Sequence, residues 1–163
     1  MTQIILYILL EKIEKNRLKA IHIFVGSYML NINLSRKMPD DFVKFGEEQI
    51  RMLLNSVSGI EFVMLCSSDG FEIALANKKN VTNSGKIAAV SSSILAMVTA
   101  FISEINLIDC QTITLDAENG KALLTAIPHP KHPLVMVALT SKDILLGQML
   151  YETKSTAEAL VKY

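Results

Sequence analysis

The sequence has few of the residues that mark several common functional classes. Its 163 residues contain no tryptophan, two cysteines and three histidines, and 16 basic side chains balance 16 acidic ones. A nucleic-acid groove needs clustered lysine and arginine, so the formal net charge of +0 and the aromatic content of 6% argue against one. The length is that of one domain with enough chain for a real core.

Cysteine and histidine are too few and too scattered to predict a disulfide framework or a metal centre. Cys66 and Cys110 lie in separate apolar, strand-like runs, which favours two buried thiols in a reduced compartment. A disulfide would require their strands to be neighbours with suitable geometry. His129 and His132 share a proline-flanked loop that contains no cysteine, aspartate or glutamate to complete a metal site. We therefore predict no metal, no cofactor and a solvated loop.

No segment has the spacing of a catalytic or phosphate-binding motif. Asn83-Ser84-Gly85-Lys86 is similar to the end of a phosphate loop, but Asn80 and Ile87 occupy the places where the motif needs glycine and Ser or Thr. The serines at 91–93 have no histidine in their own segment to act as a general base. The sequence therefore predicts a protein that is not an enzyme. The alternative is an unrecognised hydrolase, whose activity would vanish on changing one serine or histidine.

Residues 1–37 differ from the rest of the chain in being rich in Ile, Leu, Lys and Asn. Their uninterrupted apolar run is too short to span a bilayer, and no basic residues precede it as in a signal peptide. Met38-Pro39-Asp40 is typical of a helix start, with Asp40 as its cap. We predict an N-terminal extension over 1–37 and a domain over 38–163, and hypothesise that the natural product begins at Met38. The alternative is an amphipathic arm that docks on the domain or on a membrane surface.

The pattern after residue 38 predicts an α/β (α+β) fold in the order helix, two strands, helix, three strands, helix. Apolar periodicity and turn signals predict helices over 41–57, 84–106 and about 143–161. The predicted strands cover 60–67, 71–76, 111–116, 121–127 and 134–140. Each link between successive strands is short enough for an antiparallel hairpin. We expect a five-stranded, mostly antiparallel sheet with the central helix on one face and the two terminal helices on the other.

The helix predicted over 84–106 carries no charge between Lys86 and Glu104, which is unusual for a surface helix. We expect it to be too short and too polar to span a membrane. One face has large apolar side chains, predicted to hold the sheet: Ile87, Val90, Ile94, Met97, Val98, Phe101 and Ile105. The opposite face has small uncharged side chains, which we expect to be covered by a second helix: Ala89, Ser92, Ser93, Ala96, Thr99, Ala100 and Ser103. The alternatives are a helix buried in its own domain, or merely an exposed one rich in Ala and Ser.

The strand predicted over 111–116 alternates polar and apolar residues, as a half-exposed edge strand does. An unpaired edge is a site for pairing with another chain. Together with the small face of the central helix, this edge predicts a two-fold symmetric dimer interface. Its predicted residues are Ala89, Ser92, Ser93, Ala96, Thr99, Ala100, Ser103, Thr112 and Thr114.

Residues 50–150 resemble the roadblock domain family, of the dynein light-chain and Ras-like GTPase regulator type. The resemblance rests on the order of four features: Val57-Ser58-Gly59-Ile60, Ser68-Asp69-Gly70-Phe71-Glu72-Ile73-Ala74, the Ala- and Ser-rich helix 85–106, and the Asn119-Gly120 hairpin. It implies a non-enzymatic module that dimerises through its central helix and the following strand into one continuous sheet. It also implies docking to small GTPases or to motor and signalling partners. Residues 1–37 have no counterpart in the family's shorter domain.

The sequence and the resemblance together predict a cytoplasmic, homodimeric adaptor that regulates or scaffolds a small Ras-like GTPase. They predict no nucleic-acid partner and no transmembrane segment. Two alternatives stay open. A small-molecule-sensing α/β domain would need a sizeable internal pocket, and a general protein-interaction scaffold would bind unrelated partners.

Overall fold

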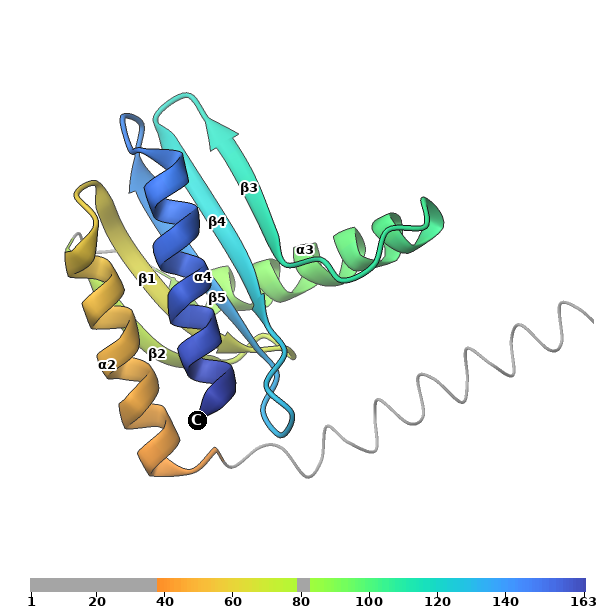
Figure 1. Ribbon diagram of the computed structural model, residues 1–163, viewed down its shortest axis with the longest axis horizontal. Helices are drawn as coiled ribbons and strands as arrows, with labels where there is room; N and C mark the ends of the chain where they lie inside the picture. The colour runs from red at the N-terminus through yellow and green to blue at the C-terminus, as the bar shows by residue number, and fades with distance from the viewer. Residues whose placement is uncertain (1–37, 79–82) are drawn as a thin grey trace, which may run out of the picture. The chain divides into compact units, whose positions relative to one another are not determined.

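The computed structural model describes residues 38–78 and 83–163. By its internal contacts the chain divides into Met1–Lys37 and Met38–Tyr163, and the hypotheses about residues 1–37 concern residues outside the described part. The second unit has the predicted order of elements (Figure 1). These are α2 (Asp40–Ser56), β1 (Ile60–Ser67), β2 (Glu72–Asn77), α3 (Ser84–Glu104), β3 (Thr112–Ala117), β4 (Gly120–Ile127), β5 (Leu134–Ser141) and α4 (Leu146–Lys162).

The five strands form one sheet in the order β2-β1-β5-β4-β3, and every neighbouring pair is antiparallel. The central pair runs from Ile60 opposite Thr140 to Ser67 opposite Leu134. β1 and β5 are buried over most of their length, which accounts for their nearly continuous apolar sequence. β2 and β3 are the two edges of this sheet.

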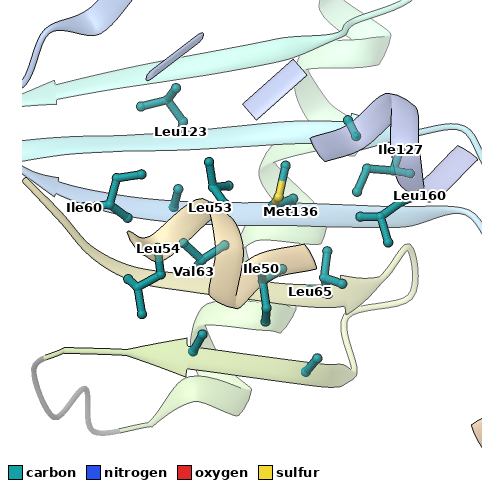
Figure 2. Packing of buried hydrophobic residues seen from close by; sticks show 14 of the residues in the cluster. Ile50, Leu53, Leu54, Ile60, Val63, Leu65, Leu123, Ile127, Met136 and Leu160 are labelled. Atoms are coloured by element: carbon teal, nitrogen blue, oxygen red, sulfur yellow. The ribbon is translucent and has the colours of Figure 1, made fainter. Parts of the chain in front are cut away.

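Helices cover both faces of the sheet. Alternate residues of β1 divide between the faces, with Val63 and Leu65 toward α2 and α4, and Met64 toward α3. Figure 2 shows Leu53 of α2 and Leu160 of α4 in the same buried cluster as the strand residues. Figure 1 shows α2 and α4 on one side of the sheet and α3 crossing the other. The predicted fold class and layer arrangement are therefore confirmed.

Two details of the helix ends differ from the predictions. The cap position of α2 is Pro39, and no side chain forms a capping hydrogen bond there, so the prediction of an Asp40 cap is wrong. Asp40 and Asp41 lie instead in the first turn, where the helix dipole favours negative charge. α4 begins at Leu146 and not near residue 143.

The length and composition of α3 meet the criteria for a helix that crosses a membrane. Its 21 residues reach about 30 Å at 1.5 Å per residue, so the expectation that it is too short and too polar is wrong on those grounds. The same test is passed by core helices of soluble domains, which makes it weak evidence for a membrane span. The side chains of α3 that contact the sheet therefore say more about the role of this helix than its length and composition do.

Candidate interaction surface

α3 packs against the sheet through its N-terminal half. Its buried residues are Ala88 and Ser91, both small. The half-buried Ile87 and Leu95 pack against the cluster that contains Met64 of β1. The contact face therefore combines two small residues with flanking aliphatic ones, which allows the helix backbone to lie close to the strands.

The large apolar face predicted to hold the sheet is only partly turned toward it. Val90, Met97 and Phe101 are 57%, 65% and 63% exposed, and Ile105, just after the helix, is 50% exposed. The prediction is wrong for these four residues. The remaining three members are half-buried: Ile87, Ile94 and Val98.

The turn between β1 and β2 helps to set the position of α3 over the sheet. Gly70 has φ +87°, and a Cβ added there would lie 2.9 Å from Ala89 Cα. Ser92 Oγ donates a hydrogen bond of 2.8 Å to Ser68 O in the same turn. These contacts come from a hairpin distant in sequence, so helical periodicity carries no information about them. They are the physical reason why the apolar stripe of α3 does not centre on the sheet.

Ser91 is the last buried residue of α3, so the C-terminal half of the helix has none. Figure 1 shows this half extending past β3, beyond the edge of the sheet. The following turn has Asn106 and Asp109 at φ 58° and 56°, a left-handed conformation that Asn and Asp tolerate better than other residues. Within this turn Leu107 is 58% exposed and Ile108 is 85% exposed.

The register of β3 assigns its side chains to the two faces. Thr114 lies opposite Leu123, which belongs to the α2 and α4 core, so Thr114 faces that side of the sheet. Leu115 is the next residue along β3 and therefore faces the α3 side, where it is 42% exposed. Thr112 shares the face of Thr114, and its Oγ1 lies 3.3 Å from Thr125 Oγ1.

Seven exposed apolar side chains thus lie on α3, on the turn after it and on the α3 side of β3. We name them the α3 apolar patch, formed by Val90, Met97, Phe101, Ile105, Leu107, Ile108 and Leu115. Thirteen large hydrophobic residues in the described part are exposed, so more than half of them lie in this one region. A concentration of exposed apolar side chains in one region marks a contact surface.

The nine predicted dimer residues occupy three environments. Six are exposed on α3: Ala89, Ser93, Ala96, Thr99, Ala100 and Ser103. Ser92 is half-buried and bonded to its own chain, and the two threonines of β3 face the α2 and α4 side. The hydroxyls of Ser93 and Thr99 donate to Ala89 O and Leu95 O, at 2.9 and 2.8 Å. A second chain can therefore cover these two hydroxyls without leaving them unpaired.

The two cysteines are free and differ in environment. Cys66 is buried, and this burial, with the nearby Asp69 carboxylate, raises the pKa of its thiol to about 12. Such a thiol stays protonated at neutral pH and is a poor nucleophile. Cys110 precedes β3 and is half-exposed, so the prediction of a second buried thiol in a strand is wrong. Among the described residues, no group of three or more His, Cys, Asp or Glu side chains is arranged to hold a metal ion.

The chain belongs to the Roadblock/LC7 domain family, because the family model matches residues 47–129. The match begins within α2 and ends in the loop after β4, so it includes α3 and β3, which carry the α3 apolar patch. No curated protein matches the sequence closely enough to be counted as a relative.

Several solved structures have the same fold. The gliding protein MglB from Thermus thermophilus is 14% identical, with a TM-score of 0.69, covering 77% of this chain and 92% of its own. MglB from Myxococcus xanthus is 15% identical, with a TM-score of 0.68 and coverages of 77% and 91%. A Roadblock/LC7 domain from Streptomyces avermitilis is 14% identical, with a TM-score of 0.64 and coverages of 72% and 95%. At these identities the likeness is one of fold.

Proposed function

We propose that this chain is a homodimeric, non-enzymatic regulator of a small Ras-like GTPase. Its membership of the Roadblock/LC7 family supports the GTPase part, because the roadblock type implies docking to such partners. The single observation that supports dimerisation most strongly is the α3 apolar patch. We also propose that the protein acts in the cytoplasm, in keeping with its two free cysteines.

In the proposed dimer, the α3 apolar patch of one copy lies against the same patch of the other. A two-fold axis next to β3 would bring the two helices together and align the open edges of the two β3 strands. The sheets would then be continuous across the interface. A stable dimer buries roughly 1,600 Å² in total. Met97, Phe101 and Leu115 provide the large apolar side chains for the centre of such a contact.

The small face of α3, with Ala89, Ser93, Ala96 and Ala100, is the second possible dimer contact. It lies on the same exposed helix as the α3 apolar patch but on a different side. One of the similar structures is an MglB in a tetrameric arrangement, which supports assembly of this fold into oligomers. Met97→Glu and Ala96→Glu place the same charge on the two sides in turn and so distinguish them.

The regulatory step would be carried out through contact with the GTPase. The GTPase would hydrolyse its own nucleotide, and the dimer would position a loop or stabilise one nucleotide state. A regulator acts by differential affinity, so it must bind the GTP-bound and GDP-bound forms unequally.

The test is affinity capture from native extract with the purified protein as bait, followed by reconstitution. We expect a small GTPase among the captured proteins, and we expect its rate of GTP hydrolysis or nucleotide release to change when the bait is added. Met97→Glu, which we expect to weaken dimerisation, serves as the matched bait. Reproducible capture of unrelated proteins alone would favour the general scaffold, and a saturable small-molecule ligand would favour the sensor domain.

A further inference from the structure

The loop 128–133 between β4 and β5 lies against the ends of two helices. It meets the start of α2 and the end of α4, and Figure 1 shows the three segments at the same end of the domain. Together they line an open hollow of about 300 Å³. Its lining residues are Pro39, Asp41, Phe42, His129, Pro130, Lys131, His132, Val161 and Tyr163.

Four rings pack together in this hollow. The Phe42 ring centroid lies 5.0 Å from that of His129, 5.6 Å from that of His132 and 5.5 Å from that of Tyr163. The two imidazoles are stacked, with centroids 5.6 Å apart and planes 13° apart. His129 is buried, so the expectation that this loop is simply solvated is wrong for its first histidine.

The hydrogen bonds of His129 require a neutral imidazole. Its Nδ1 accepts the backbone N–H of His132 at 3.0 Å and that of Lys131 at 3.3 Å. An accepting Nδ1 places the ring proton on Nε2. Protonation of Nδ1 would direct an N–H at two N–H donors and would break both bonds that fold the loop.

The groups around His129 do not favour a positive charge on its ring. Lys131 lies in the same loop, and His132 is stacked on His129. Asp41 of α2 is the facing carboxylate, but its Oδ1 already accepts the Phe42 N–H and its Oδ2 accepts the Tyr163 hydroxyl. Burial first, and then the charges of His132 and Lys131, lower the pKa of His129.

We propose that His129 and His132 form a pH-sensitive latch. The latch holds the loop 128–133 over the start of α2 and the end of α4 while the His129 imidazole is neutral, and it opens when His129 is protonated. His132 Nδ1 is buried and has no hydrogen-bond partner in the described part of the chain, so this nitrogen does not help to hold the ring in place. Opening uncovers Phe42, while β4 and β5 stay paired in the sheet.

The latch does not depend on the proposed GTPase function, because its residues lie in none of the elements that carry the α3 apolar patch. It would make the surface at this end of the domain sensitive to mild acidification. As the pH falls from about 6.5, the ordinary pKa of histidine, through the lowered pKa of His129, the hollow would widen and expose an aromatic ring to a partner.

The test is amide hydrogen exchange measured by NMR on the full chain between about pH 7.5 and about pH 5. We expect the protection factors of the Lys131 and His132 amides to fall by about tenfold or more on acidification, while those of β1 are retained. In His129→Asn, an amide oxygen takes the place of Nδ1 and cannot be protonated, so the fall should vanish. His22→Gln serves as the control, because it removes the third histidine and should leave the fall unchanged.

Two results would overturn the proposal. One is protection of the Lys131 and His132 amides that stays constant in the wild-type chain across this pH range. The other is an equal loss of protection in His129→Asn. If that variant does not fold, the wild-type ring signals decide: a His129 that carries its proton on Nδ1 at neutral pH is incompatible with the latch.

Discussion

The two faces of the sheet differ in how completely their own chain covers them. The α2 and α4 side has 19 buried hydrophobic residues in one cluster, and the α3 side has six. α2 and α4 contribute buried residues along their lengths, from Phe42 to Leu54 and from Met149 to Leu160. α3 contributes Ala88 and Ser91 and leaves the α3 apolar patch outside. The first side therefore maintains the monomer, and the second is where we place the contact with another chain.

The largest expected effect separates the two faces by stability. Ile50→Ala removes a fully buried side chain under α2 and should lower the free energy of unfolding by about 2–5 kcal/mol. Met97→Ala truncates a side chain that is 65% exposed and should change the monomer's stability by less than about 0.5 kcal/mol. Urea denaturation at concentrations that keep both chains monomeric measures the difference. Equal losses in the free energy of unfolding would show that the two faces contribute equally to the stability of the monomer.

The second prediction concerns self-association. Met97→Glu places a charge in the centre of the α3 apolar patch and should weaken dimerisation by about 3 kcal/mol, more than a hundredfold in the dissociation constant. Sedimentation velocity over a concentration series measures it, and circular dichroism checks that the monomer remains folded. A wild-type chain that is monomeric throughout the series would contradict the dimer.

Ala96→Glu is the matched variant, since it introduces the same charge at the next position of α3. Ala96 belongs to the small face, which the sequence predicts as the interface. A dimer split by Met97→Glu and retained by Ala96→Glu places the contact on the α3 apolar patch. The opposite result places it on the small face and restores the sequence-based prediction.

The third prediction tests what holds α3 over its side of the sheet. Gly70→Ala requires an unfavourable φ of +87° and directs a methyl group at the Ala89 backbone, so it should cost about 1–3 kcal/mol. Gly85→Ala is the control, because a Cβ there meets nothing within 4 Å. That control should be neutral or should stabilise by up to about 1 kcal/mol. Thermal unfolding of both variants shows whether the turn and α3 are coupled, and an unaffected Gly70→Ala would show that they are not.

The smallest expected effect is a pH dependence on the covered side. The pKa of His129 is lowered in the folded protein, so on acidification the unfolded chain takes up the proton first. The stabilisation is complete above the unfolded value of about 6.5 and is lost as the pH falls through the lowered folded value. Urea denaturation across this pH window should show that the wild-type chain loses stability on acidification and that His129→Asn loses less. Identical pH profiles would contradict this contribution.

The order of helices and strands could be predicted because local patterns determine it. Polar and apolar alternation, the turn at Asp69-Gly70 and the helical stripe of α2 each depend on residues close together in the sequence. The antiparallel pairing of consecutive strands follows from the short links between them. The burial of His129 could not be found in this way, because Phe42, its main ring contact, is 87 residues away along the chain.

The sequence by itself determined which elements form, that α3 carries no charge along most of its length, and that one of its faces is large and apolar while another is small. Only the tertiary structure decided which of these faces meets the sheet. The rotation of a helix about its axis depends on contacts with distant segments, here the turn at Ser68 and Gly70 against Ala89 and Ser92. Those contacts direct Ala88 and Ser91 to the sheet and leave Met97 and Phe101 exposed for another chain.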